Sequence, residues 1–188
     1  MKKEVKLDSL TSIKSKWSKE KESYKKKEVG TGVETFVEEI FVCPELFNLK
    51  KGLESTDHKK RKLEYTRQTR TKRDKGQADF VIFIKGLSIV IPVEVELYEN
   101  IKAGERQLLR YQLAWDKQYG ILTDGFTWRF YNNSSFRQFD IDDILNNPTN
   151  FLTFWADYIK PENYYLSFFE ASGQLLSILD HTVQLILE

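Results

Sequence analysis

Thiols and imidazoles are scarce in this chain of 188 residues, which has one cysteine, Cys43, and two histidines, His58 and His181. A single cysteine excludes an internal disulfide and a metal site made of several thiolates. The two histidines are too few and too far apart in the sequence for a recognisable histidine metal motif. Cys43 lies in the apolar stretch 41–44 and is predicted to be a small buried side chain.

Long apolar runs are also missing. No uninterrupted apolar segment approaches the roughly 20 residues that a membrane-spanning helix requires. The lysine-rich N-terminus is not followed by the apolar stretch of a secretory signal. The sequence has no internal repeat and no glycine-rich phosphate loop, so nothing in it indicates ATP hydrolysis. We therefore expect a cytoplasmic protein without a membrane partner.

The composition, with 40% hydrophobic and 14% aromatic residues, is sufficient for a substantial core in one compact domain. The periodicity predicts both helices and strands, as in an α/β fold. We expect an N-terminal basic helix within 1–29, a core within 30–145, and a C-terminal helical extension within 146–188. The expected helices are 10–26, 32–42, 101–117, 151–158 and 166–187, and the expected strands are 62–70, 77–85, 87–97, 120–123 and 127–131.

Two neighbouring predicted strands carry acidic side chains that can converge. On the second strand, the apolar residues at 89, 91, 93, 95 and 97 alternate with Glu94 and Glu96, so these apolar residues form one buried face and the glutamates share the other. Asp79 lies at the start of the preceding strand. Carboxylates arranged in this way suit a hard divalent cation such as Mg²⁺, as in a phosphodiesterase. The alternative is a sheet with one solvated face, which the same alternation predicts.

The segments that follow have a particular order. The predicted helix 101–117 carries Gln107 and Tyr111 four residues apart, hence on one face. The run 119–131 is typical of a strand, a tight Asp-Gly turn and a second strand.

The series Asp79, Glu94-Val95-Glu96 and Gln107-x-x-x-Tyr111 resembles the PD-(D/E)XK, or restriction-endonuclease-like, nucleases. The run 120–131 is similar to the region after the catalytic motif in the N-terminal nuclease domains of multi-domain restriction enzymes. This resemblance covers about residues 30–131. It implies a restriction-endonuclease-like core, with a central mixed β-sheet flanked by helices, that hydrolyses DNA with Mg²⁺, for which Mn²⁺ would substitute.

The sequence departs from the family pattern at two positions. Ala78 stands where the family name has proline, at a loosely kept position, and Glu96 occupies the place of the lysine. In the family that lysine helps to orient the attacking water and offsets negative charge, and some Mg²⁺-dependent members carry glutamate there. Glu96 is therefore compatible with activity, and also with a degenerate, inactive site.

The resemblance also implies roles for the acidic residues. Asp79 and Glu94 would bind the metal, and Glu96 would accept a proton from the attacking water or contribute to a second metal ion. Three carboxylates close together repel, so that without metal at least one should take up a proton more readily than a free side chain does.

A fourth acidic group is expected from the helix 32–42. Its apolar residues 33, 36, 37, 40 and 41 form one stripe, which Glu34 flanks, with Glu38 one turn further on the same side. Family members often use a glutamate of an early helix as an additional metal ligand, and Glu34 is the candidate here. The alternative is a helix whose acidic side faces water.

Gln107 and Tyr111 would, by resemblance, support the catalytic site or contact substrate phosphates. An amide offers both donor and acceptor, and a tyrosine hydroxyl can hydrogen-bond a carboxylate or a phosphate. The alternative is ordinary helix surface and core packing, since Leu108, Leu109 and Trp115 also fit a buried stripe with Tyr111.

Basic residues are concentrated upstream of the acidic ones. Residues 50–75 hold eleven Lys or Arg against four acidic residues, whereas residues from 76 onward hold eight basic and fifteen acidic ones. Lysine and arginine supply salt-sensitive affinity for phosphate backbones. We expect double-stranded DNA as the partner, with the backbone near Arg67, Arg70, Lys72 and Arg73.

The C-terminal segment is more apolar than a solvent-facing tail should be, with eight Leu, Ile or Val between 175 and 187. We expect it to wrap the core, or to dock on another domain of a larger restriction enzyme or on a second nuclease copy. By resemblance, the larger enzyme would be a combined restriction and modification enzyme or a type I-like translocating restriction enzyme. Three functions remain open: a Mg²⁺-dependent DNA endonuclease, a catalytically inactive nuclease-fold module that binds DNA or a partner, and pure protein interaction through this helix.

Overall fold

The computed structural model describes residues 9–26, 32–52, 63–70, 76–84, 90–115 and 117–160, with the backbone alone at 68–70. The chain divides into two compact units, 1–153 and 154–188. Of the second unit only residues 154–160 are described, and within it Tyr158 packs its ring on Phe154 and Trp155. The predicted helix 166–187 lies outside the described residues.

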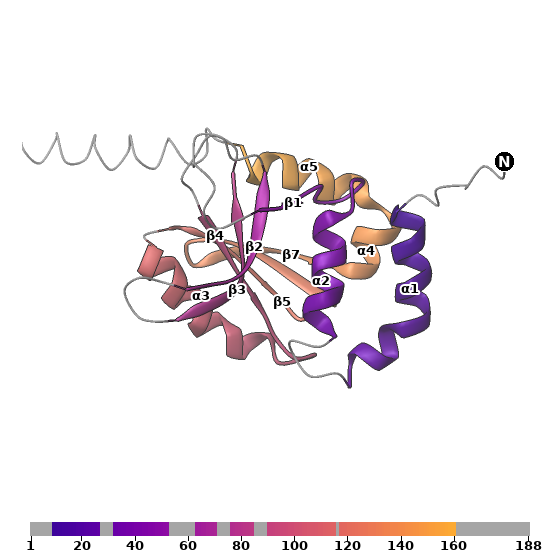
Figure 1. The fold of residues 1–188 in the computed structure, drawn as a ribbon, viewed down its shortest axis with the longest axis horizontal. Helices are drawn as coiled ribbons and strands as arrows, with labels where there is room; N and C mark the ends of the chain where they lie inside the picture. Colours follow the sequence, from indigo (N-terminus) through magenta and orange to yellow (C-terminus); the bar gives the residue numbers. More distant parts are fainter. Residues whose placement is uncertain are drawn as a thin grey trace, which may run out of the picture. The chain divides into compact units, whose positions relative to one another are not determined.

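The first unit is an α/β structure built on a mixed sheet of seven strands, in the order β1 to β7 along the chain. The strands are β1 (Lys50–Lys51), β2 (Glu64–Arg70), β3 (Gln77–Phe83), β4 (Val90–Val95), β5 (Tyr119–Thr123), β6 (Thr127–Asn132) and β7 (Ser135–Asp140). The pairs β1–β2 and β4–β5 are parallel, and the other four neighbouring pairs are antiparallel. The predicted mixed sheet flanked by helices is therefore confirmed (Figure 1).

Helix α3 (Ile101–Trp115) is the crossover between the parallel strands β4 and β5. A parallel pair requires such a connection, because the chain must return to the same end of the sheet before the second strand begins. The helix packs on the two strands that it joins. Its buried residues are Ile101, Gly104, Leu108, Tyr111 and Gln112, which recur at helical spacing.

Helix α2 (Val33–Val42) covers the opposite face of the sheet from α3 (Figure 1). Side chains alternate along β3, so neighbouring residues reach different helices. Phe80 packs edge-on against Phe41 of α2, whereas Val81 belongs to a buried cluster with Tyr111 of α3. The α2 side is an aromatic core, which continues from Phe41 to Phe47 and Trp128.

Helix α1 (Ser9–Tyr24) is held against α2 by aromatic rings and ion pairs. Trp17 and Tyr24 both stack on Phe36, and Lys16 forms an ion pair with Glu39. Two further helices follow β7, α4 (Ile141–Asn146) and α5 (Pro148–Tyr158). In α5, Phe151 contacts Phe47, Phe130 and Phe139 and closes the aromatic core.

Most predicted elements are present with shifted ends, and three were missed. β1, β7 and α4 were not predicted. For β7 the sequence held a signal, because Asn133 takes the left-handed conformation (φ 55°) in the turn between β6 and β7. Asparagine tolerates this conformation, so the pair Asn132-Asn133 was an overlooked turn signal.

The prediction that Leu97 shares the buried face of β4 was wrong. Leu97 is 41% exposed, because β4 ends at Val95 and the chain turns away.

Cys43 is buried, as predicted, and its thiol hydrogen-bonds the Glu45 carboxylate. Among the described residues, no helix combines the length and apolar character needed to cross a membrane.

Candidate functional site

The antiparallel ladder between β3 and β4 ends where the acidic residues begin. Its last pair is Phe80 with Val93, and the next positions on the two strands are Asp79 and Glu94. Here the Asp79 side chain substitutes for a backbone acceptor, because its Oδ2 accepts a hydrogen bond from the Val95 N–H at 2.8 Å. This bond fixes the carboxylate beside β4, and no described residue hydrogen-bonds its other oxygen, Oδ1.

Glu94 is the most deeply buried carboxylate of the site. It is 4% exposed, and no described group hydrogen-bonds its Oε2. Burial, together with the smaller effect of the charges of Asp79, Glu96 and Glu34, raises the pKa of Glu94 to about 9, whereas Arg110 acts to lower it. A buried charged oxygen without a partner is costly, so Glu94 is protonated at neutral pH unless a cation offsets its charge.

Asp79 and Glu96 show the same effect to a smaller degree. Burial raises the pKa of Asp79 to about 6, against the hydrogen bond from Val95, and the charges of Glu34 and Glu96 add to the rise. Burial also raises the pKa of Glu96. The predicted increase in proton affinity is therefore present, although burial contributes more to it than repulsion among the carboxylates.

Gly104 of α3 makes room for the Glu96 side chain. A Cβ atom at position 104 would lie 2.7 Å from Glu96 Cγ, 2.9 Å from Glu96 Oε1 and 2.5 Å from Leu122 Cδ1. These distances are shorter than carbon contacts in folded proteins allow. The absence of a side chain at this one helical position thus lets α3 pack directly on the end of β4.

Glu34 joins the site from α2, on the other side of the sheet. It is 5% exposed, in the first turn of the helix, and its charge raises the pKa of both Asp79 and Glu94. Burial raises its own pKa, while Arg67 lowers it. Glu34 of α2, Asp79 of β3, Glu94 of β4 and Glu96 directly after β4 are thus brought together, and we call these four residues the acidic cluster. Glu34 does not face water.

Gln107 and Tyr111 adjoin the acidic cluster from α3. The Gln107 side chain donates a hydrogen bond to the Tyr111 hydroxyl, which itself donates to the backbone carbonyl of Gln77. The charges of Glu94 and Asp79 add to the effect of burial in raising the pKa of Tyr111 to about 12. Tyr111 is only 1% exposed, with its hydroxyl satisfied within the protein. Tyr111 therefore ties α3 to β3, and its contact with DNA remains a prediction.

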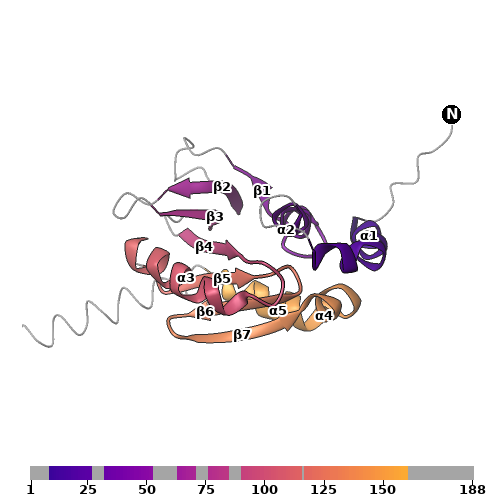
Figure 2. The same ribbon diagram turned by 90° about the horizontal axis from the view of Figure 1, so that it is seen from below.

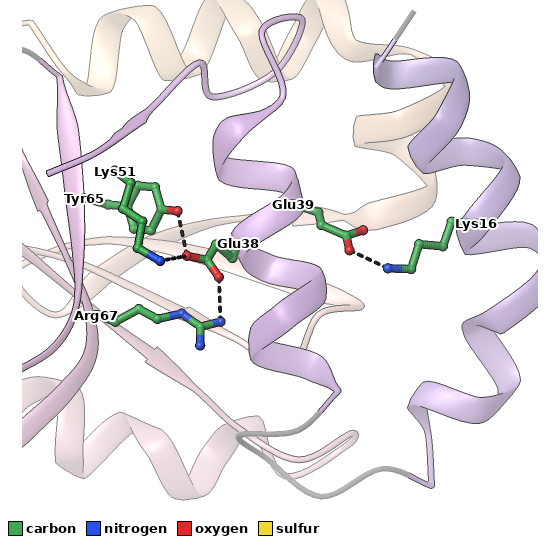
Figure 3. Close-up of polar contacts among 6 residues, drawn as sticks. All are labelled: Lys16, Glu38, Glu39, Lys51, Tyr65 and Arg67. Carbon is green, nitrogen blue, oxygen red and sulfur yellow. Dashed lines mark hydrogen bonds and ion pairs between the residues drawn. The ribbon is translucent and has the colours of Figure 1, made fainter. Parts of the chain in front are cut away.

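Arg67 has an internal partner that the sequence did not predict (Figure 3). Its guanidinium pairs with Glu38 of α2 at 2.8 Å and lies 5.3 Å from the centroid of the Phe80 ring. Glu38 also accepts hydrogen bonds from the Tyr65 hydroxyl and the Lys51 ammonium. Arg67 Nε is buried and has no hydrogen-bond partner among the described residues. A contact between Arg67 and DNA remains a prediction.

The other predicted DNA-binding residues are described less fully. Arg70 is the last residue of β2, where only the backbone is described, and Lys72 and Arg73 lie outside the described residues. Their contacts with DNA remain predictions.

The acidic cluster supplies hard oxygen donors, but it is not a closed coordination group in this structure. No three Asp, Glu, His or Cys side chains in the described part of the chain converge closely enough to hold a metal ion. The donor chemistry suits Mg²⁺, and the unpartnered Glu94 Oε2 is the atom that a cation would satisfy. Metal binding by Asp79, Glu94 and Glu34 therefore remains a prediction.

Two residues that position the site were missed in the sequence. Gly104 could have been noticed as a glycine inside an amphipathic helix, where it costs stability unless close packing requires it. Arg110 influences Glu94 and follows Gln107 by three residues, hence on a neighbouring part of the same helix.

No family model matches the chain, and comparison with curated proteins and with solved structures gave no significant match either.

Replacing Glu94 by Gln should make the metal-free protein more stable at high pH. The folded pKa of about 9 exceeds the ordinary value of 4.5, so folding binds a proton between these two pH values. The stability that this proton supplies is complete below about pH 4.5 and is lost as pH rises toward 9. We expect Glu94→Gln to raise the thermal midpoint at pH 8 by several degrees. In a protein of this size, a change of 1 kcal/mol in the free energy of unfolding shifts the midpoint by about 2–4 °C.

The difference between the two proteins should be small near pH 5, and Glu22→Gln, on the exposed side of α1, should track the parent at every pH. Parallel melting curves of the parent and Glu94→Gln across pH 5 to 8 would contradict the assignment of a buried, destabilised Glu94 carboxylate.

Gly104→Ala should destabilise the fold although alanine is the better helix former by about 1 kcal/mol. The added methyl group meets Leu122 and Glu96, and overpacking of this kind costs about 1–3 kcal/mol. Urea unfolding should show that Glu96→Ala reduces this cost. As a control, Ala103→Gly at the exposed neighbouring position should lose stability by the same amount with or without Glu96.

Proposed function

We propose that this protein is a Mg²⁺-dependent DNA endonuclease with a restriction-endonuclease-like core, acting as the cleavage domain of a restriction enzyme. The substrate is double-stranded DNA, and other domains or a second nuclease copy would supply recognition and the cut in the second strand. The fold supports this proposal at the level of a mixed sheet flanked by helices. The arrangement of the acidic cluster supports it at the level of chemistry.

The observation that carries the proposal is the Glu94 carboxylate. Glu94 is a buried acid with an unpartnered oxygen among three other carboxylates. Such a group lowers the stability of a protein, so its presence indicates a function that requires it. Strained electrostatics of this kind concentrate at functional sites. The resemblance of the Asp79, Glu94, Glu96 and Gln107 series to the nuclease motif gives the cluster a specific chemistry.

Phosphodiester hydrolysis requires an activated water, stabilisation of the charge at phosphorus, and neutralisation of the leaving oxygen. A Mg²⁺ ion held by Asp79, Glu94 and Glu34 would supply Lewis acidity for these needs. Val95 holds one oxygen of Asp79 in place, and α3 holds Glu96 against Gly104. Glu34 and Glu94 are buried, whereas Asp79 and Glu96 are half-buried, and Glu96 would receive the proton of the attacking water.

Gln107 occupies the rim of the site. Its side chain is exposed and reaches the Tyr111 hydroxyl, which is fixed on the strand that carries Asp79. We assign Gln107 the role of orienting a substrate phosphate or water, because its amide keeps a further donor and an acceptor for this purpose.

A second candidate is a catalytically inactive nuclease-fold module that binds DNA. It is favoured because no three described Asp, Glu, His or Cys side chains converge closely enough to hold a metal ion. Glu96 in place of the family's lysine would then mark the decay of the site. Both candidates predict DNA binding, and only the first predicts cleavage.

The parent protein should nick supercoiled plasmid DNA in Mg²⁺ or Mn²⁺ and not in EDTA. Asp79→Asn and Glu94→Gln keep the shape of each side chain and remove its charge, so each should slow nicking at least about 100-fold, or ~2.7 kcal/mol at 1.36 kcal/mol per factor of ten. The measurement is the rate of conversion from supercoiled to open-circular DNA.

Glu22→Gln removes one acidic charge from an exposed position on α1 and serves as the matched control, with an unchanged rate expected. Thermal melting of every variant verifies folding. Equal nicking by the parent and both site variants would trace the activity to a contaminant and refute the proposal. Binding without nicking in either metal would establish the inactive module instead.

A further inference from the structure

The two ends of the sheet differ in how they are protected against pairing with another strand. One end is β1, which has only two residues, both lysine. The other end is β7, which has six residues and lies at the far side of the sheet from β1 (Figure 2). Proteins protect edge strands by short length, lysine, proline or a β-bulge. β7 contains no lysine and no proline, and its register with β6 is unbroken over all six residues, so β7 lacks these protections.

The outer backbone groups of β7 point away from the sheet. Along an antiparallel pair, residues that exchange backbone hydrogen bonds alternate with residues that do not. The N–H of Ile141, directly after β7, donates to the carbonyl of Phe126, so the odd-numbered positions of β7 face β6. The N–H and C=O groups of Phe136 and Gln138 therefore face outward, and no described strand pairs with them. Five of the six positions of β7 are exposed, which leaves this edge open to another strand.

The charges of β7 favour the same strand of a second copy as the occupant. Two β7 strands can pair antiparallel with their outward groups facing each other when the two Gln138 residues lie opposite each other. In this register Arg137 lies opposite Phe139 of the second copy, and Phe136 lies opposite Asp140. Like charges directly opposite each other destabilise a strand pair, and this register has none. A two-fold axis one residue earlier would instead set the two Arg137 side chains against each other.

We infer that β7 is the interface of a two-fold homodimer, in which two copies pair antiparallel about Gln138 and their sheets join into one. A two-fold arrangement is the commonest closed assembly, and it covers both unprotected edges at once. The phenyl ring of Phe136, which is 47% exposed in the single chain, lies within the joined edge. This inference does not depend on nuclease activity.

The test removes the outward donor at the centre of the interface. Gln138→Pro deletes an N–H that does not bond to β6, and proline is tolerated at such positions of an edge strand. Two reciprocal backbone hydrogen bonds across the axis are lost, so the dimer should dissociate at least about tenfold more readily. The measurement is the monomer–dimer constant from sedimentation equilibrium. As the matched control, Gln138→Ala keeps the N–H and loses only the side-chain bond from Arg129, so its constant should equal the parent's.

A second pair of variants tests the register itself and does not require proline to be tolerated. Gln138→Glu and Gln138→Lys each set like charges opposite each other across the axis, so each variant alone should form a weaker dimer than the parent. A mixture of the two should form a mixed dimer that is about fivefold tighter than either variant alone. The same two substitutions at Ser15, an exposed position on α1, should leave the constant at the parent's value, alone and mixed.

Each outcome decides for or against the inference, with thermal melting to verify folding of every variant. Weakening by Gln138→Pro together with a tighter mixed dimer would establish the β7 interface. A parent that stays monomeric at concentrations on the order of 100 µM would overturn it. An unchanged constant in Gln138→Pro, or a mixed dimer no tighter than the separate variants, would overturn it as well. A monomeric parent that nicks DNA would leave the proposed function standing, and a dimeric parent that does not nick would leave this inference standing.

Discussion

A carboxylate held away from water is the constraint on which the rest of this site depends. Glu94 lies where β3 and β4 part, and its Oε2 has no hydrogen-bond partner among the described residues. Burial of such a group costs free energy, which the protein limits by keeping the acid protonated. The neighbours of Glu94 are acidic as well, so the surrounding packing must hold together groups that repel one another. Any ligand that neutralises the cluster would bind with the benefit of relieving this repulsion.

The scaffold around the cluster is correspondingly firm. Asp79 is fixed by the Val95 N–H, and Tyr111 ties α3 to the backbone of β3. On the other face, Glu38 gathers Tyr65, Lys51 and Arg67 and so fastens α2 to β1 and β2 (Figure 3). The ties made by Tyr111 and Glu38 do not involve the four carboxylates of the acidic cluster. They hold α2, which carries Glu34, and the strands that carry Asp79 and Glu94 in a fixed arrangement.

Much of the fold was predictable because long periodic segments carry a strong local signal. The alternation around Glu94 and the apolar stripe of α2 predicted a strand and a helix within a few residues of their observed limits. The misses have local causes too. β7 is exposed at five of its six positions and lacks an apolar alternation, and α4 has only six residues. Leu97 looked like a strand residue because nothing in its type indicates that the chain turns there.

The sequence by itself predicted the elements that carry Glu34, Asp79 and Glu94, whereas Glu96, predicted on the same strand as Glu94, lies just beyond the end of that strand. Only the tertiary structure decided that Glu34 reaches the other carboxylates across the sheet, that Tyr111 is internal, and that Arg67 pairs with Glu38. The physical reason is that periodicity reports the direction of a side chain relative to its own element, whereas partners and burial depend on how elements far apart in the chain pack. Proton affinity follows from burial, so it too was decided at the tertiary level.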